Sequence, residues 1–269
     1  MDAGDQFGSS VAINAAGDRL AVGAENDDGF GEDPFATASG AVRLFTFADT
    51  DFGGGALVGT IGRGYIGAGN IDLGMELFGT RNDRFGASVA LNAAGDRLVV
   101  GATGDDGFGN FVSGSGSVRL FTFADTLFGG GALAGTIGRG YIGAGDIDPG
   151  IVLEEFDEFG TSVALNAAGD RLAVGAFRDD GFGNVADASG TVHLFTFTDT
   201  DFGGGTLAGT IGTGYSGAGD IDLGTALEAG DWFGRSVALN AVGDRLAVGA
   251  LIDRGFGNVG SSFGAVRLF

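Results

Sequence analysis

Residues 85–102 read FGASVALNAAGDRLVVGA, and this stretch predicts a β-hairpin. Polar or small residues alternate with apolar ones from Ser88 to Leu91, which is the two-residue period of a half-buried strand. The step Ala-Ala-Gly-Asp that follows favours a turn, because glycine readily adopts a positive φ. The apolar run at 97–102 then predicts a second strand that returns beside the first.

The same hairpin pattern occurs four times, starting at Phe7, Phe85, Phe159 and Phe233, with a period of about 75 residues. In the second repeat a polar loop leads to a third strand at 117–123. A run of three glycines precedes a fourth strand at 132–137. No window shows sustained helical spacing with capping residues, so we expect essentially no helix.

Four antiparallel strands repeated at a constant period are typical of β-propeller blades, whereas the repeats of an open β-solenoid are usually much shorter. We therefore expect an all-β fold, a β-propeller-type array of four-stranded antiparallel blades of which the last is incomplete. The expected limits are about 5–70, 83–146 and 157–220 for the complete blades and about 231–269 for the partial fourth blade.

The composition of the chain argues against several classes of function. The chain has 269 residues, no cysteine, 14 basic residues that are all arginine, and 35 acidic residues, for a net charge of −21. Such a negative surface repels nucleic acid and anionic lipid, and no stretch is apolar for long enough to insert into a membrane as a helix. A lone histidine, His193, and the absence of cysteine and lysine leave little material for nucleophilic catalysis. We therefore expect that the protein is not an enzyme. If it were one, a carboxylate-dependent hydrolase would be the alternative. We expect His193 at the surface or between blades, because arginine takes its place in the other repeats.

The motifs FGxSV at 85–89, LxVGA at 98–102 and GxVxL at 116–120 resemble the FG-GAP repeat, which builds the propeller of integrin α chains. The resemblance is closer to bacterial variants from large secreted or surface-anchored, haemagglutinin-like proteins. It implies an extracellular or cell-surface recognition or adhesion scaffold, although no signal peptide is visible at Met1. The implied partners are a protein or glycan ligand on a cell surface or matrix and further repeats of the same protein. The alternative is a structural spacer propeller, with or without calcium, that has no specific ligand.

The resemblance also implies calcium, but the turn at 92–96 offers one carboxylate where the family's usual site has several. The other metal candidates are paired aspartates in the loop between the second and third strands of each blade. They are Asp27, Asp28, Asp105, Asp106, Asp179 and Asp180, and in the fourth copy Arg254 replaces the second aspartate. Two carboxylates per loop would bind Ca²⁺ weakly, on the order of 10⁻⁴–10⁻³ M. The competing interpretation is a structural turn, because an aspartate before glycine hydrogen-bonds its own backbone. We expect no other cofactor.

Two further expectations concern packing. An arginine follows the turn aspartate in each repeat, and we expect it to bond carbonyls or carboxylates close to the turn. The four positions are Arg19, Arg97, Arg171 and Arg245. We expect Trp232 either to contact a partner or to lie over the neighbouring blade. An array with an incomplete last blade leaves blade faces open at both ends, so we expect this chain not to close a ring alone and to associate.

Overall fold

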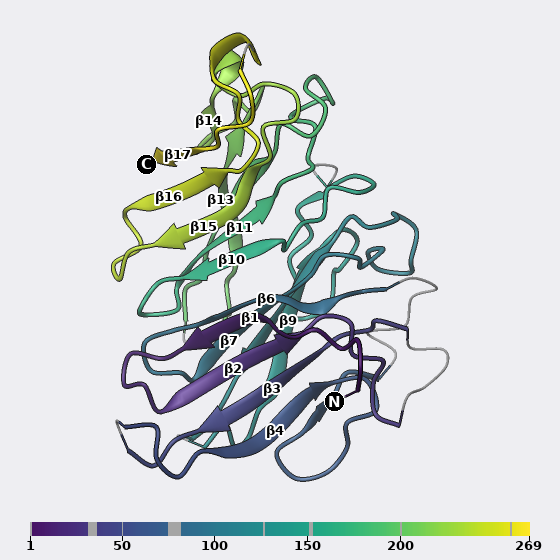
Figure 1. The fold of residues 1–269 in the computed structure, drawn as a ribbon, viewed down its shortest axis with the longest axis vertical. Coiled ribbons are helices and arrows are strands. Elements are labelled where there is room, and N and C mark those ends of the chain that lie inside the picture. The colour runs from purple at the N-terminus through teal and green to yellow at the C-terminus, as the bar shows by residue number, and fades with distance from the viewer. Residues whose placement is uncertain are drawn as a thin grey trace.

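The computed structural model describes residues 2–31, 37–49, 51–74, 82–125, 127–150, 153–199, 201–258 and 260–269. They form four sheets that follow one another along the chain (Figure 1) and are antiparallel except for a short parallel edge strand in the first and third. The first contains β1 (Phe7–Ile13), β2 (Arg19–Ala24), β3 (Ala41–Thr46), β4 (Ala56–Gly62) and β5 (Ile71–Asp72). The second contains β6 (Phe85–Leu91), β7 (Arg97–Ala102), β8 (Ser117–Thr122) and β9 (Ala132–Gly138). The third contains β10 (Ser162–Leu165), β11 (Arg171–Ala176), β12 (Thr191–Thr196), β13 (Thr206–Gly212) and β14 (Ile221–Asp222). The fourth contains β15 (Phe233–Leu239), β16 (Leu246–Ala250) and β17 (Ala265–Leu268).

Each sheet is one small propeller blade, so the predicted all-β fold and blade arrangement are confirmed. The described helical segments are two short 3₁₀ turns, η3 (Gly224–Ala226) and η4 (Phe256–Asn258). No helix among the described residues is long and apolar enough to cross a membrane.

The quoted stretch forms the β6–β7 hairpin. Leu91 pairs with Leu98, and the register shifts between Phe85 and Ser88, where Gly86 has a φ of +93° that favours glycine. Asn92 holds the turn: its Oδ1 accepts the backbone N–H groups of the three residues 95–97 at 2.9–3.2 Å. The turn at 92–96 is therefore closed by its own side chain.

A short fifth strand closes the outer edge of two blades, which the sequence analysis does not anticipate. β5 pairs parallel with β4 through Ile61 and Ile71. The Asn70 side chain also accepts the Thr60 N–H at 2.8 Å. Two residues are too few to show a strand period in the sequence, so this element depends on the pairing alone.

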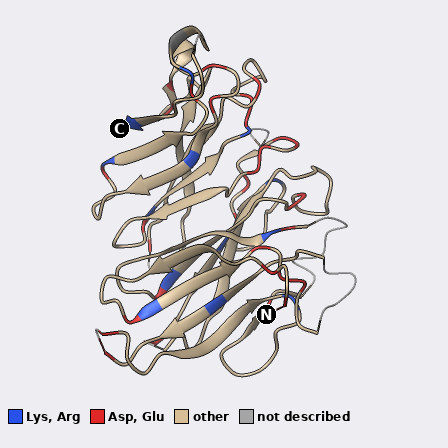
Figure 2. Cartoon of the chain, in the orientation of Figure 1, with Lys and Arg blue, Asp and Glu red and all other residues tan. Residues whose placement is uncertain are grey.

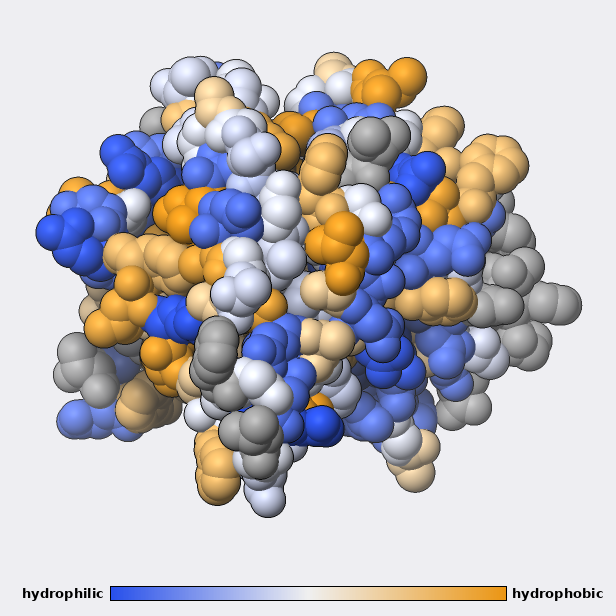
Figure 3. Space-filling view, turned by 90° about the horizontal axis from the view of Figure 1, so that it is seen from above, coloured by the Kyte–Doolittle hydropathy of each residue, from blue (hydrophilic) through white to orange (hydrophobic). Residues whose placement is uncertain are grey.

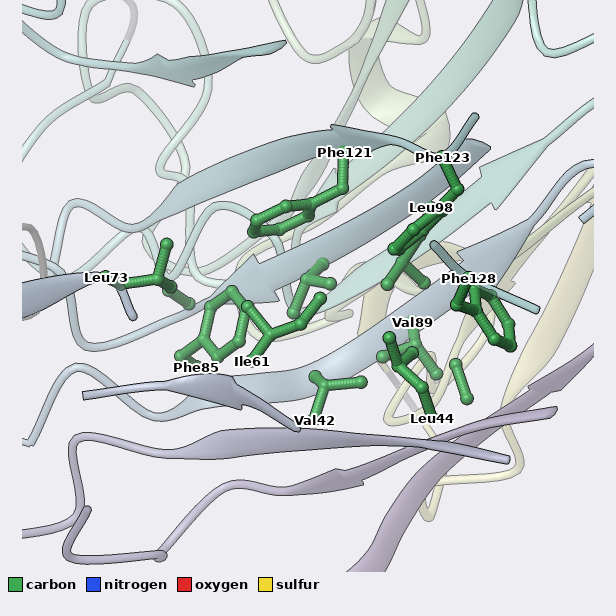
Figure 4. Close-up of a cluster of buried hydrophobic side chains, with 13 residues drawn as sticks. Val42, Leu44, Ile61, Leu73, Phe85, Val89, Leu98, Phe121, Phe123 and Phe128 are labelled. Atoms are coloured by element: carbon green, nitrogen blue, oxygen red, sulfur yellow. The ribbon is translucent and has the colours of Figure 1, made fainter. Parts of the chain in front are cut away.

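The hydrophobic cores lie between the blades. One cluster joins Val42, Leu44 and Ile61 of the first blade to Phe85 and Phe121 of the second (Figure 4). Equivalent clusters join the second blade to the third and the third to the fourth. The inner strands β1, β6, β10 and β15 therefore lie side by side, which places all four hairpins in one row (Figure 1).

The motif residues hold the blades at close range. A Cβ on Gly101 would lie 2.0 Å from the Gly160 carbonyl oxygen of the next blade, so only glycine fits. The Ser88 hydroxyl donates to the same carbonyl at 2.7 Å. Gly23 and Gly175 meet the next blade in the same way. The Phe-Gly-x-Ser and Val-Gly-Ala motifs are thus the two halves of one blade junction.

The predicted role of the turn arginines is confirmed at three junctions. Arg19 donates to the Gly95 carbonyl of the next blade at 2.7 Å, and Arg97 donates to the Ala168 carbonyl at 3.0 Å. Arg171 makes the equivalent bond at 3.4 Å. Trp232 is half-buried, and its ring lies 5.0 Å from that of Phe177 in the third blade, as expected for a side chain that packs over its neighbour.

Candidate functional site

One end of the molecule carries the long loops. β2 and β3 are antiparallel, so the loop between them lies at the end opposite the β1–β2 turn and the β3–β4 hairpin. We call this end the loop face. It is formed by the β2–β3, β7–β8, β11–β12 and β16–β17 loops and by the segments that lead into β1, β6, β10 and β15. Acidic residues gather in these loops, whereas many of the arginines lie on or beside strands (Figure 2).

The first aspartate of each loop pair is part of a buried cluster. Asp105 accepts the Gly107 N–H at 2.7 Å and forms an ion pair with Arg119 at 2.9 Å. The Tyr141 hydroxyl donates to the same carboxylate at 3.1 Å. Burial alone lowers the pKa of Arg119, but the attraction of Asp105 outweighs it and leaves that pKa above its usual value. The guanidinium is therefore charged and neutralises a buried carboxylate.

The cluster is repeated along the array with one exception. Asp27 pairs with Arg43 at 2.8 Å in the first blade, and Asp253 pairs with Arg267 at 3.2 Å in the fourth. In the third blade the arginine position is His193, which is completely buried. Of the two expected positions, at the surface or between blades, the surface position is therefore excluded. Burial lowers its pKa to about 4, so the ring is neutral at pH 7.

The third blade consequently holds an uncompensated acidic pocket. Burial is the main cause that raises the pKa of Asp157, and repulsion from Asp179 is the second cause. Burial also raises the pKa of Asp179. The pocket has a volume of about 120 Å³ and also contains Glu154, Asp180 and Tyr215. A cavity of about 320 Å³ lies nearby, between the β7–β8 loop and the segment before β10.

The second aspartate of each pair bonds the backbone near the end of the loop, where the chain leads into the third strand. Asp28, Asp106 and Asp180 each accept a backbone N–H from eight to ten residues further along, at 2.6–2.7 Å. These contacts fit the structural-turn interpretation of the paired aspartates. They also leave each loop fixed at both ends.

The donor set is a poor match for calcium in the first two blades, because Asp27 and Asp105 already face a guanidinium. No group of three or more acidic or histidine side chains among the described residues has a metal-binding arrangement. Calcium in these loops stays a prediction. Glu32, which the sequence places five positions after Asp27, lies outside the described residues.

An exposed phenylalanine stands at the tip of three of these loops. Phe30, Phe108 and Phe182 are more than half exposed. Each ring meets the edge or face of a tyrosine, Tyr65, Tyr141 or Tyr215, at 5.8–5.9 Å between centroids. Their backbone N–H groups bond carbonyls of the loop after the fourth strand. Each aromatic side chain is thus presented to solvent from a fixed backbone.

Sequence reasoning missed a further buried acid. An aspartate stands two residues before each Phe-Gly pair, and all four copies are buried: Asp5, Asp83, Asp157 and Asp231. The pKa of Asp83 is raised to about 8, mainly by burial and secondly by repulsion from Asp105. The signal was present in the sequence, because this aspartate recurs in every repeat beside a residue that varies.

Comparisons with known proteins agree with the repeat pattern. Residues 79–121 and 153–195 match the family model described as FG-GAP repeat. No curated protein sequence matches the chain.

Solved structures with a similar chain path have low identity. A candidate 6-phosphogluconolactonase from Bacteroides uniformis is 13% identical with a TM-score of 0.47, covering 92% of this chain and 51% of that chain. The Cps50 (Swd1) β-propeller domain of Myceliophteria thermophila is 13% identical, with a TM-score of 0.42 and coverage of 89% and 49%. Sqt1 of Saccharomyces cerevisiae is 12% identical, with a TM-score of 0.44 and coverage of 94% and 44%. The chain spans about half the length of these structures.

The two matched segments contain the Phe-Gly strand, the hairpin and the third strand of the second and third blades, and the same elements recur in the first and fourth. Residues 79–121 and 153–195 are therefore FG-GAP repeats, and the four blades of the chain are arranged as a β-propeller.

Proposed function

We propose that this chain is a non-enzymatic recognition or adhesion scaffold that binds a protein or glycan through its loop face. The observation that carries the proposal is the set of exposed phenylalanines, Phe30, Phe108 and Phe182, on loops whose backbone N–H groups bond aspartate side chains of the same loop. Aromatic side chains contribute most to binding when they are held in place, because little conformational entropy is lost.

The chemistry of the face limits its ligands. The aromatic tips stand beside carboxylates in a chain with a net charge of −21. This arrangement suits a ligand with apolar or sugar-ring surface and with positive or neutral charge. It disfavours nucleic acid, because phosphates are repelled.

The buried groups support a non-enzymatic role. His193 is neutral and fully buried. The aspartates of the loop pairs accept backbone N–H groups or face arginine, as scaffold residues do. We place the protein outside the cell or on its surface, as part of a larger bacterial surface or secreted protein, in keeping with the FG-GAP resemblance. Further repeats of the same protein are proposed neighbours.

A glycan and matrix-protein array tests the proposal. We expect the wild-type chain to bind selectively, and Phe108→Ser/Phe182→Ser to bind about tenfold or more weakly, as for the loss of an aromatic hot spot. The matched control is Leu127→Asp, an exposed apolar side chain at the opposite end. Aspartate occupies the same position in the first and third blades, as Asp51 and Asp201, so the control should fold and bind normally.

A wild-type chain that binds nothing selectively would favour the structural spacer instead. Equal loss of binding in the control and in the double variant would show that the loop face is not the binding surface. Thermal melting of all three proteins checks that each is folded.

A further inference from the structure

The loop face has a hollow at the junction between the second and third blades, and we call it the junction hollow. It has a volume of about 320 Å³ and lies between the β7–β8 loop and the segment that leads into β10. Both blades have a packed neighbour on each side, so this junction is complete. The volume is at the lower end of the roughly 300–1,000 Å³ of small-molecule sites. The lining includes Asn82, Arg84, Thr103, Asp106, Phe156 and Glu158.

The aromatic side chain in this lining is Phe156, which is 51% exposed. Exposure alone marks no site, because single apolar side chains are common on protein surfaces. Figure 3 shows such side chains among polar ones at the end of the molecule where the fourth blade lies. The backbone of Phe156, however, has a φ of +68°, a conformation that bulky side chains rarely adopt.

The fold does not need a phenylalanine at this position. Glycine takes the equivalent position in the first and fourth blades, where Gly4 has a φ of +115° and Gly230 a φ of +82°. The Phe156 N–H donates to the Ser113 carbonyl at 2.8 Å, and the Gly230 N–H makes the equivalent bond, also at 2.8 Å. Bulky residues in such strained conformations cluster at binding sites, where the strain serves a function. The ring of Phe156 therefore calls for a functional explanation.

The hollow is open because two aromatic side chains are absent from it. In the junction between the third and fourth blades, Phe177 and Trp232 occupy the positions of Thr103 and Glu158. Their rings lie 5.0 Å apart, and Phe177 is buried. Threonine and glutamate are smaller and more polar, so the second junction has space where the third has a packed aromatic pair.

The polar groups around the hollow are of both hydrogen-bonding kinds. Thr103 is 95% buried, and its hydroxyl has no hydrogen-bond partner among the described residues. Asp106 uses one carboxylate oxygen to accept the Gly114 N–H at 2.7 Å. Glu158 is already neutralised by Arg178, at 3.2 Å. The lining therefore offers carboxylate acceptors, a buried hydroxyl and amide and guanidinium donors beside one aromatic face.

A sugar ring matches this combination. One face of the ring carries C–H groups that pack on an aromatic side chain, whereas each hydroxyl on its edge both donates and accepts hydrogen bonds. An apolar ligand would leave the buried polar groups unpaired, which is costly. An acidic ligand would be repelled by Asp106 and by a net charge of −21.

We propose that the junction hollow binds one uncharged sugar ring, with its C–H face on Phe156 and its hydroxyl groups bonded to Asn82, Thr103 and Asp106. The inference rests on the proposed recognition by the loop face and specifies the ligand there as a glycan. The hollow holds a single ring of that glycan, and the exposed loop tips contact the parts that extend beyond it.

Saturation-transfer NMR on the full chain tests the proposal. The uncharged probes are the methyl glycosides of glucose, galactose, mannose and N-acetylglucosamine, and methyl glucuronide is the acidic probe. We expect at least one uncharged probe to bind with a Kd on the order of 1 mM, because a single ring makes few contacts. Methyl glucuronide should give no signal.

Three variants connect binding to the hollow. Phe156→Gly should weaken binding at least tenfold without lowering the melting temperature, because glycine occupies this position in two other blades. Phe156→Tyr keeps the aromatic face and should bind like the wild type. Thr103→Phe/Glu158→Trp installs the aromatic pair of the next junction, and it should fill the hollow and abolish binding.

The control variant is Leu127→Asp, at the opposite end of the molecule, which should bind the sugar like the wild type. A Phe156→Gly variant that binds normally would overturn the proposal. A large fall in its melting temperature would do the same, because the ring would then be structural. Tighter binding of methyl glucuronide than of every uncharged probe would also contradict the choice of ligand.

The glycan and matrix-protein array separates this inference from the proposed function. If no uncharged probe binds but the array still gives a selective ligand that Phe108→Ser/Phe182→Ser weakens, the sugar site is wrong and loop-face recognition stands. If neither the probes nor the array gives binding, both proposals fail.

Discussion

Replacing Arg119 with histidine would impose on the second blade the residue that the third blade carries naturally. Arg119 is completely buried and donates to Ser117 at 2.7 Å and to Asp105 at 2.9 Å. A buried neutral histidine would leave Asp105 without a countercharge. Removing one partner of a buried ion pair costs about 3–5 kcal/mol, because the remaining charge stays desolvated.

We expect Arg119→His to lower the free energy of unfolding by about 3 kcal/mol at pH 7.5, the lower end of that range, because Asp105 keeps its bonds from Gly107 and Tyr141. Urea unfolding followed by circular dichroism measures the change.

The reciprocal change provides the control. His193→Arg would place a guanidinium beside Asp179, whose pKa is raised by burial. We expect this variant to gain roughly 1–3 kcal/mol at pH 8 through the new charged hydrogen bonds. The reasoning would be refuted if Arg119→His stayed within about 0.5 kcal/mol of the wild type at pH 7.5, the usual range for an uninvolved surface change.

Three further predictions follow from the same structure. The folded-state pKa of Asp83 is raised from 3.8 to about 8, so its contribution to stability is present below pH 3.8 and is lost as the pH rises through 8. Asp83→Asn should therefore raise the urea midpoint more at pH 8.5 than at pH 4. An equal change at both pH values would contradict this. Gly101→Ala should cost about 1–3 kcal/mol by forcing a Cβ against the Gly160 carbonyl of the next blade. Gly249→Ala, where the three atoms nearest to the new Cβ all belong to Ser236, should cost clearly less, and similar losses would argue against the junction. Calcium, if it binds, should raise the melting temperature only at millimolar concentration, and Asp179→Asn/Asp180→Asn should abolish the shift; a micromolar response that survives would place the ligands elsewhere.

The repeat period was sufficient to predict the blades, because four copies of one hairpin leave few other arrangements. That Arg97 bonds a backbone carbonyl was also predictable, since an arginine that recurs beside a turn needs an acceptor, although the sequence did not indicate that the carbonyl belongs to the next blade. Both inferences depend on repetition, which the sequence displays directly.

Other features depended on contacts between distant segments. The buried position of His193 follows from its neighbours on β12 and from Tyr215, which lies on a different loop. The Asp105–Arg119–Tyr141 cluster joins three separate segments, so the spacing of any two of them does not reveal it. The exposure of Phe108 was not predicted, and its sequence gives no sign of it, because apolar residues are more often buried.

Hydrogen exchange on the complex with a ligand selected from the array tests the proposed loop-face recognition most directly. We predict slower exchange in the β7–β8 and β11–β12 loops, at residues 103–116 and 177–190, and unchanged exchange in the β8–β9 hairpin at the opposite end. Protection confined to the β8–β9 and β12–β13 hairpins, with the loops unchanged, would contradict the proposed loop face.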